Sequence, residues 1–449
     1  MSIYIPGRGN MAASLSGMTR RNFLISTAAI GAASVAAPAV VRAQSGVTLR
    51  FLNTETSVAS QTALKNACDE YESKFGVKII IDSSPISGTM EKAMAAINAG
   101  QSYDIVTSGF IAVVLELVDA GVLIPLTDMV KKYDWGKGAA WEYEGENWYY
   151  PFDYNLVVNY YRKDLYAQKG LKIPESWDEF VENCQALTVL DGGNVDVGGC
   201  VIPLASDSST NWASFGNMFA EGTQLFDGDW NVVLDQNENA DRAARFLDFY
   251  AELYKTMPPG MNAVGYAQLM SLFATGKAAH TLYSGRLVET LEATNPELAD
   301  QYGIFASPGS TGQKALSYAF DGFLVFKTKQ SEEAVKFLQW FVDEHYVDWL
   351  LSAWMNNHPS RMDIYEDERW KSHPMIKKHW ETMMQMKSFI DGDGVTITSV
   401  DTSGPSIDVR PCNVFNANIL PEMLQQKVLG NRSSADCVAA AAQRIRSII

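Results

Sequence analysis

The sequence predicts an α/β protein built from two lobes. Its 449 residues are more than one ordinary hydrophobic core needs. From Val47 onward, strand-like runs alternate with amphipathic helical segments, and repeated strand–helix–strand units of this length indicate a parallel sheet covered by helices. Polar residues that follow the predicted strands come from distant parts of the chain. A chain that crosses several times between two lobes would bring them together.

The elements follow from hydrophobic periodicity and from helix start and stop residues. Thr54 and Thr56 can cap the first helix, which runs to about Lys74, and Gly76 ends it. Strands are expected over 47–52, 77–82, 103–109, 279–282 and within 317–326. Helices are expected over 91–98, 177–190, 241–255, 332–343 and 421–449.

The first 43 residues have the pattern of an export signal. Arg20 and Arg21 precede an apolar run over 23–37, and a small-x-Ala site ends at Ala43. The segment TRRNFL resembles the twin-arginine export signal. The alternative is a retained anchor helix, but the run is shorter than the ~20 residues that a span needs. We therefore predict cleavage near Ala43 and a periplasmic mature protein.

The charge of the mature chain excludes several partners. Removing residues 1–43 takes away four arginines and no acid, so the formal net charge changes from −16 to −20. A field of this sign repels nucleic acids and anionic membrane surfaces. We expect no nucleic-acid partner.

Five cysteines lie in the mature part. In an oxidising compartment they can form disulfides, and we expect Cys184 with Cys200 first, Cys412 with Cys437 second, and Cys68 left over. The alternative is that they are small buried hydrophobic side chains. No C-x-x-C spacing occurs, so metal or redox roles are not expected.

Several segments, in order and spacing, resemble the family-1 extracellular solute-binding proteins of ABC transporters, the group of maltose-binding protein. They are DEYESKFGVKIII, YDIVTSG, LVDAGVLIPLTD, YYPFDYNLVVNYYRKDLYAQKGLKIPESWDEF, FATGKAAHTLYSGR, DGFLVFKTKQSEEAVKFLQWFVD and VLGNRSSADCVAAAAQRI. The resemblance covers nearly the whole mature chain. It implies a two-lobed periplasmic-binding-protein fold, a ligand cleft between the lobes, and hinge closure around the ligand.

The resemblance also implies where the chain crosses between the lobes. Crossings are expected near 152–155, 320–322 and 359–363. The first lobe would then comprise residues 46–152 and 323–360, and the second lobe residues 153–320 and 361–449. In the first crossing, Tyr149 and Phe152 are expected under the hinge, and Tyr154 with Asp153 at the cleft.

A sugar-binding cleft needs aromatic faces for the ring and polar groups for the hydroxyls. The candidate ligand-binding residues are Glu55, Ser108, Asp153, Tyr154, Trp212, Arg286, Asp321, Arg361 and Phe415. Sugar-binding relatives often carry an aromatic residue after the 279–285 strand, where this chain has Ser284-Gly285-Arg286. A guanidinium there can bind a carboxylate or vicinal hydroxyls, which makes an acidic sugar an alternative to a neutral one.

Other functions have less support in the sequence. Residues 227–238 resemble a calcium-binding EF-hand loop, but Val232 occupies the position that requires glycine, so a hairpin is expected and no metal site. Walker, G-x-S-x-G and H-E-x-x-H motifs are absent from the sequence, and we expect no enzyme and no cofactor. The expected function is a carbohydrate receptor that delivers its ligand to membrane permease subunits, as a monomer. The alternatives are a polyamine receptor, with Asp153, Glu55 and Asp321 as counter-charges, and an exported glycoside-degrading enzyme.

Overall fold

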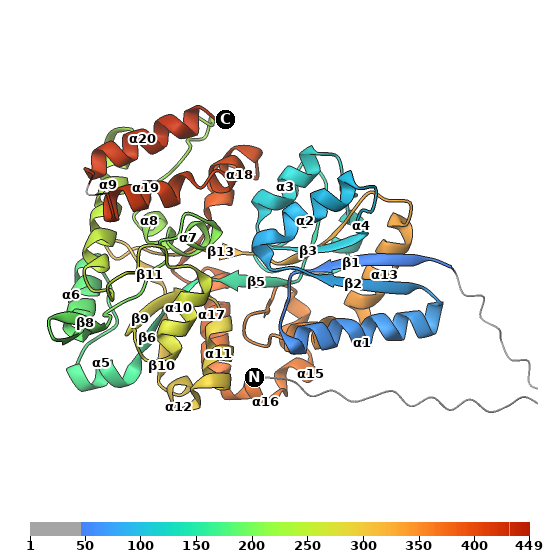
Figure 1. Ribbon diagram of the computed structural model, residues 1–449, viewed down its shortest axis with the longest axis horizontal. Helices are drawn as coiled ribbons and strands as arrows, with labels where there is room; N and C mark the ends of the chain where they lie inside the picture. The colour runs from blue at the N-terminus through green and yellow to red at the C-terminus, as the bar shows by residue number, and fades with distance from the viewer. Residues whose placement is uncertain (1–45, 431) are drawn as a thin grey trace, which may run out of the picture. The chain divides into compact units, whose positions relative to one another are not determined.

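A computed structural model of the chain describes residues 46–430 and 432–449. The predicted export signal lies outside these residues. None of the described helices is long and apolar enough to cross a bilayer. The two-lobed α/β architecture is confirmed by the structure and by its solved neighbours, described below (Figure 1).

The first lobe contains a five-stranded sheet with the order β2-β1-β3-β14-β4. Strand β1 pairs in parallel with β2 and β3, whereas β14 pairs antiparallel to β3 and β4. Burial of Leu49, Phe51 and Phe323 at 0% exposure places the core of this lobe around the sheet. The strands are β1 (Thr48–Asn53), β2 (Lys78–Ser83), β3 (Ile105–Ser108), β4 (Tyr150–Pro151) and β14 (Gly322–Val325).

Helices that follow these strands complete the first lobe (Figure 1). Ser57 caps α1 by accepting a hydrogen bond from the Ser60 amide, so the predicted caps Thr54 and Thr56 were wrong. Gly76 ends α1 in the left-handed conformation, as expected. The helices are α1 (Val58–Phe75), α2 (Ile86–Asn98), α3 (Ile111–Asp119), α4 (Thr127–Val130), α13 (Ser331–Glu344) and α14 (Tyr346–Leu351).

Three segments cross between the lobes and pair with one another. Strand β5 (Asp153–Leu156) is antiparallel to both β13 (Tyr318–Ala319) and β15 (His358–Pro359). Strand β5 overlaps the first crossing that the resemblance implies, β13 ends just before the second, and β15 meets the start of the third. Because the segments are hydrogen-bonded together, the connection between the lobes is a small sheet and not three independent strands.

The second lobe is organised around the antiparallel sheet β10-β6-β9, whose strands are β6 (Val158–Arg162), β9 (His280–Tyr283) and β10 (Tyr302–Phe305). Smaller sheets are formed by β11 (Ser307–Pro308), β12 (Lys314–Leu316) and β16 (Thr396–Ile397), and by the hairpin β7 (Val189–Asp191) and β8 (Asn194–Val197). The helix predicted over 177–190 ends earlier, at Leu187, because Thr188 has extended backbone angles. Residues 189 and 190 belong to strand β7 of the hairpin instead.

Most remaining helices belong to the second lobe. They are α5 (Lys163–Lys169), α6 (Trp177–Leu187), α7 (Ser208–Ala213), α8 (Gly216–Ala220), α9 (Asn237–Tyr254), α10 (Tyr266–Ala274), α11 (Arg286–Thr294) and α12 (Pro296–Ala299). After β15 come η1 (Met362–Glu366), α15 (Glu368–Lys371), α16 (Pro374–Lys378), α17 (Trp380–Asp391) and η2 (Val400–Thr402).

The segment 421–449 is not one helix, as was predicted, but two, α19 (Ile419–Val428) and α20 (Ser434–Arg446). Helix α18 (Val409–Asn416) precedes them. Ser433 caps α20 by accepting from the Asp436 amide. Helix α18 also contacts α3 of the first lobe, and the Phe110 and Phe415 rings lie 4.9 Å apart.

All five cysteines are buried and free, so the predicted disulfides were wrong. The sulfur of Cys184 lies 3.6 Å from Nδ1 of His280, and the thiol of Cys200 donates to the carbonyl of Leu253 at 3.5 Å. The Cys184 and Cys200 thiols also interact with each other, which together with burial raises the pKa of Cys184, but no disulfide joins them. The alternative, small buried hydrophobic side chains, describes them correctly.

Candidate ligand-binding site

A polar cavity of about 450 Å³ lies among residues of both lobes and of the crossing strands. We call it the polar cavity. Its lining includes Glu55, Asn155, Trp212, Tyr283, Arg286 and Asp321. These residues come from the loop after β1, from β5, from α7, from the end of β9, from the start of α11 and from the residue before β14. The site therefore depends on the fold to bring distant segments together.

Glu55 lies in a short loop that Asn53 holds in place. The side-chain oxygen of Asn53 accepts from the Glu55 amide at 3.1 Å, and its nitrogen donates to the Glu55 carbonyl at 2.8 Å. Because Asn53 is the last residue of β1, the loop keeps a fixed relation to the sheet. The carboxylate is thus directed at the cavity from the carboxyl end of a parallel strand, where α/β sheets bind ligands.

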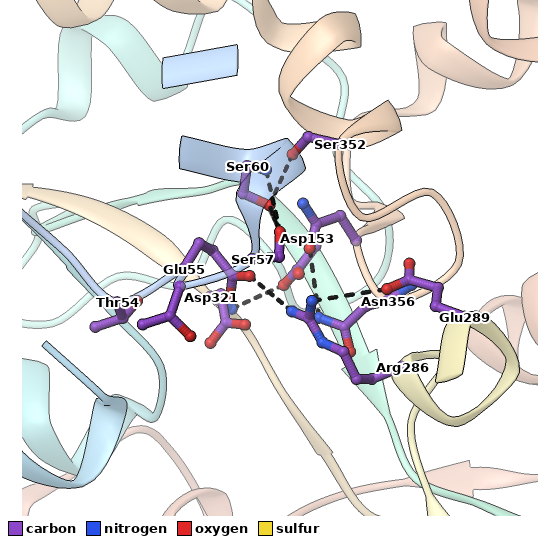
Figure 2. A network of polar contacts seen from close by, with 12 residues as sticks. Thr54, Glu55, Ser57, Ser60, Asp153, Arg286, Glu289, Asp321, Ser352 and Asn356 are labelled. Atoms are coloured by element: carbon purple, nitrogen blue, oxygen red, sulfur yellow. Dashed lines mark hydrogen bonds and ion pairs between the residues drawn. The ribbon is translucent and has the colours of Figure 1, made fainter. Parts of the chain in front are cut away.

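Arg286 is the cation of the polar cavity. Its Nη2 lies 2.7 Å from Oε2 of Glu55, and its Nη1 lies 3.6 Å from Oε2 of Glu289 (Figure 2). Burial lowers the pKa of Arg286, but the two carboxylates outweigh it and raise that pKa above its ordinary value. The guanidinium stays charged and is already neutralised within the protein.

Glu289 is positioned by the segment before β15. Its Oε1 accepts from the backbone amides of Met355 and Asn356, at 2.9 and 3.0 Å. Burial raises the pKa of Glu289, while Arg286 opposes that rise. Glu289 therefore ties the start of α11 to the third crossing.

Asp321 lies between Asn155 and Asp153. Its Oδ2 accepts from Nδ2 of Asn155 at 2.9 Å, and its amide donates to Oδ1 of Asp153 at 2.9 Å. Burial and the nearby Glu55 raise the pKa of Asp321 to about 7. A side chain on Gly109 would collide with the Asp321 carboxylate, so only glycine permits this approach.

Two buried acceptors near Asp321 lack a hydrogen-bond partner among the described residues. They are Oδ1 of Asn155 and Oδ2 of Asp153. A buried polar atom left unpaired costs about 1–3 kcal/mol. Asn155 lines the polar cavity, but its Oδ1 is buried beneath that surface, so a ligand hydroxyl can reach this acceptor only when the side chain turns toward the cavity.

Three aromatic rings form one wall of the polar cavity. The Trp212 ring packs against those of Tyr266 and Tyr283, with ring centroids 5.6 and 5.4 Å apart, and its Nε1 donates to the Asn155 carbonyl at 3.2 Å. Aromatic faces beside polar groups are the combination that binds polyhydroxylated compounds.

Four of the predicted site residues line this cavity: Glu55, Trp212, Arg286 and Asp321. Ser108 and Phe415 line a second, adjoining cavity. The lining residues that the prediction missed include Asn155, Tyr266, Tyr283 and Asn356. Tyr283 is the last residue of a strand that was predicted, so the strand-end rule could have found it.

The structure places Tyr154 and Arg361 away from both cavities, contrary to the prediction. Tyr154 is buried, and its hydroxyl donates to the Lys137 carbonyl at 2.7 Å. Side chains alternate along a strand, so Tyr154 lies on the opposite face of β5 from Asp153 and Asn155. Asp153 supports Asp321 from behind, and it is not among the residues that line the polar cavity.

Arg361 packs against residues of the first lobe. Its guanidinium pairs with Asp363, donates to the Val342 carbonyl at 3.1 Å, and lies 3.9 Å over the Tyr133 ring. All of its polar atoms are directed at protein groups, which makes it a structural residue of the third crossing.

A metal site has no support in the part of the chain that the structure describes. No group of three or more His, Cys, Asp or Glu side chains is close enough to hold an ion there. In the segment that resembles a calcium loop, Asp227 instead accepts from the amides of Asp229 and Asn231, and Phe226 bridges Val232.

The family profile of the bacterial extracellular solute-binding proteins matches residues 55–347. The chain belongs to this family. The mannitol-binding protein of Pseudomonas aeruginosa is 24% identical over 305 residues, which are 65% of this chain and 67% of that protein.

Solved solute-binding proteins have the same fold. The maltose-bound MalE3 of T. maritima superposes with a TM-score of 0.73 at 18% identity, covering 90% of this chain and 100% of that one. A solute binding protein from Agrobacterium vitis with bound D-mannitol gives a TM-score of 0.67 at 20% identity, over 89% and 97% of the two chains.

Proposed function

We propose that this solute-binding protein is the receptor of an ABC importer and binds a neutral polyol or sugar in the polar cavity. The observation that carries the proposal is the cavity itself. Both lobes contribute to it, an aromatic wall lies beside it, and a buried acceptor of Asn155 has no protein partner among the described residues. A hydroxyl of the ligand would satisfy that acceptor once the Asn155 side chain turns toward the cavity.

The related proteins support the same class of ligand. One relative is named for mannitol, and two structural neighbours hold maltose and D-mannitol. In this chain Arg286 is already paired with Glu55 and Glu289, so it offers an acidic sugar little uncompensated positive charge. We therefore favour neutral polyols and sugars over sugar acids.

The second candidate is a cationic amine such as a polyamine. The site holds four acidic side chains and one guanidinium, that of Arg286. The acids are Glu55, Asp153, Glu289 and Asp321. This excess of acidic groups would favour a cation if Asp153 and Asp321 are ionised. Burial raises the pKa of both, which weakens the argument at neutral pH.

The wider assignments rest on the family. We propose export through the twin-arginine-type signal over 1–43, a periplasmic location, a monomeric state, and docking of both lobes on membrane permease subunits. We also propose a first lobe of residues 46–152 and 323–360 and a second lobe of 153–320 and 361–449, supported by the β13-β5-β15 pairing near the boundaries. A receptor of this kind binds its ligand without converting it, so we do not propose an enzyme.

A thermal-shift screen tests the proposal. The purified protein is heated with polyols, monosaccharides, disaccharides, sugar acids and polyamines. A ligand at about 100 times its Kd should stabilise the protein by about 2.7 kcal/mol, which is a few degrees in Tm. A response confined to polyols or sugars supports the proposal, and a response confined to polyamines replaces it with the second candidate. Release of a cleaved product during incubation would mean that the protein is an enzyme.

A further inference from the structure

Phe110 lies where the polar cavity meets the second, adjoining cavity, whose volume is about 380 Å³. Three residues line both cavities: Thr54, Ile86 and Phe110. Of these, only Phe110 carries an aromatic ring. It follows the carboxyl end of β3, directly precedes α3, and is 8% exposed.

The backbone of Phe110 has a conformation that a residue with a large side chain rarely adopts. Its φ is 68° and its ψ is 124°, which is the side of the backbone map that favours glycine. Such a conformation is strained and persists only where the surrounding structure holds it, most often at ligand sites. In this protein, two residues of the C-terminal segment contact Phe110 or the helix that begins after it.

The first of these residues is Asp401, in η2. Helix α3 begins at Ile111 without a side-chain cap from Phe110, so its first amides need acceptors from elsewhere. The carboxylate of Asp401 accepts from the amides of Ile111 and Ala112, the latter at 3.1 Å, and Asp401 is 3% exposed. Asp401 therefore caps α3 and fixes the start of the helix next to Phe110.

The second residue is Phe415, in α18. The centroids of the Phe110 and Phe415 rings lie 4.9 Å apart, and their planes are tilted by 43°. Helix α18 is also joined to η2, because the thiol of Cys412 donates to the Asp401 carbonyl at 3.6 Å. The next residue after Phe415, Asn416, donates from Nδ2 to Oε2 of Glu116 on α3 at 3.3 Å. Thus η2 and α18 pack on α3 as one unit.

This unit is connected at both ends to the second lobe. Before η2, strand β16 pairs with β12, and after α18, helix α19 packs against α9. The unit itself contacts α3 of the first lobe (Figure 1). The position of Phe110 therefore depends on residues that the second lobe supplies.

Polar and aromatic groups lie on both sides of Phe110. The lining of the polar cavity includes Trp212 and Asn155, and that of the second cavity includes Asp207 and Asn416. An aromatic ring among polar side chains can cover the hydrocarbon face of a sugar or polyol while the hydroxyls form hydrogen bonds. Phe110 is placed to act as such a ring.

We infer that the ring of Phe110 contacts the bound sugar or polyol and sets its affinity, and that Asp401 is a positioning residue that holds this ring through α3. The inference rests on the proposed function. It adds one ring from the first lobe to the aromatic wall of Trp212, Tyr266 and Tyr283 from the second lobe.

Calorimetry with D-mannitol, D-mannose, D-glucose and maltose tests the role of Phe110. For each probe that binds the unaltered protein, Phe110→Ala should raise the Kd by about tenfold or more, because the contact of the ring is lost. Phe110→Leu, which keeps an apolar side chain without a planar ring, should raise it by about threefold or more and serves if the alanine variant does not fold. An unchanged Kd in the folded variants overturns the inference.

Phe75→Ala is the matched control for Phe110→Ala. It removes another ring of the first lobe, at the end of α1, where Phe75 is 49% exposed and is not among the residues that line either cavity. The Kd of Phe75→Ala should equal that of the unaltered protein. An equal rise of the Kd in Phe75→Ala and Phe110→Ala would mean that the loss of a ring acts through stability, and the inference would be wrong.

Asp401→Ala tests the positioning. This variant removes the cap of α3, so it should raise the Kd by about threefold or more although Asp401 lines neither cavity. Asp401→Asn keeps an acceptor at the same place and should restore most of the affinity. Asp401→Val also lacks an acceptor and is used if the alanine variant does not fold. A lower free energy of unfolding with an unchanged Kd would make Asp401 a purely structural residue and overturn its positioning role.

The failure of this inference differs from the failure of the proposed function. If none of the four probes and no other polyol or sugar of the thermal-shift screen binds, the carbohydrate function fails and the inference fails with it. If a probe binds and Phe110→Ala keeps the Kd of the unaltered protein, the carbohydrate function stands and only the inference fails.

Discussion

Arg286 and Glu55 form an ion pair that joins the two lobes, with Nη2 of Arg286 at 2.7 Å from Oε2 of Glu55. Glu55 follows β1 in the first lobe, and Arg286 begins α11 in the second lobe. Both side chains line the polar cavity (Figure 2). The pair therefore takes part in lobe closure as well as in the chemistry of the site, and a ligand that enters must fit around it or displace it.

Arg286→Ala should weaken ligand binding by at least about 1 kcal/mol, or roughly fivefold in Kd, since a hydrogen bond to a charged group contributes about 1.5–3 kcal/mol. The substitution also leaves Glu55 and Glu289 without their counter-charge, which should lower the free energy of unfolding. Calorimetry with the best polyol or sugar from the screen measures the first effect, and urea unfolding measures the second.

Arg369→Ala is the control for this prediction. Arg369 pairs with Asp367 on the surface, where its side chain is 58% exposed, so its loss should change neither quantity by more than about 0.5 kcal/mol. An unchanged Kd for Arg286→Ala would remove Arg286 from the ligand site and leave it as a link between the lobes.

Asp321→Asn should change how stability depends on pH. The pKa of Asp321 is raised from 3.8 to about 7 in the folded protein. Between these values the unfolded chain has lost a proton that the folded protein keeps, so the contribution of Asp321 is full below about pH 4 and falls as the pH rises to about 7. The asparagine has no proton to lose, so this part of the decline should disappear.

Urea unfolding between about pH 4 and pH 7 measures the effect, whose maximum is about 1.4 kcal/mol per pH unit for one proton. Asp229→Asn, which changes an exposed carboxylate, should keep the slope of the unaltered protein. The explanation is wrong if Asp321→Asn keeps that slope too.

The sequence predicted the architecture because its signals are local. Strand-like runs and Gly76 after α1 each depend on a few neighbouring residues, and the structure has them at the expected places. The three crossings were expected from the family resemblance, and the crossing strands lie at or next to those positions. Helix α2 is longer than predicted because it begins at Ile86, directly after Pro85, without a side-chain cap that would mark its start.

The site was harder to predict because orientation and partner are not local. Strand alternation allows either Tyr154 or its neighbours Asp153 and Asn155 to face the cavity, and the fold selects the neighbours' face. Arg361 did carry a signal, since Asp363 lies two residues later and pairs with it. That the Phe415 ring would meet Phe110 could not be predicted, because it depends on how α18 reaches the first lobe.

Tyr154→Phe should lower the free energy of unfolding, whereas Tyr283→Phe should weaken ligand binding. Tyr154 loses the bond from its hydroxyl to the Lys137 carbonyl, so the free energy of unfolding should fall by about 0.5–1.5 kcal/mol with little change in Kd. The same deletion at Tyr283 removes a hydroxyl from the lining of the polar cavity and should raise the Kd severalfold. Urea unfolding and calorimetry on both variants measure the two effects. If Tyr154→Phe raises the Kd and Tyr283→Phe does not, then Tyr154 belongs to the ligand site after all.

The five cysteines should remain thiols after purification without reductant. Burial raises the pKa of Cys68, Cys184, Cys412 and Cys437, and the thiolate is the reactive form, so a disulfide-exchange reagent should react slowly with the folded protein. In guanidinium chloride, all five should react. A sample reduced beforehand and desalted serves as the control and should give the same count. A count lower by two in the unreduced sample would mean that a disulfide forms. Cys184 with Cys200 would be the first pair to examine, because these two thiols already interact.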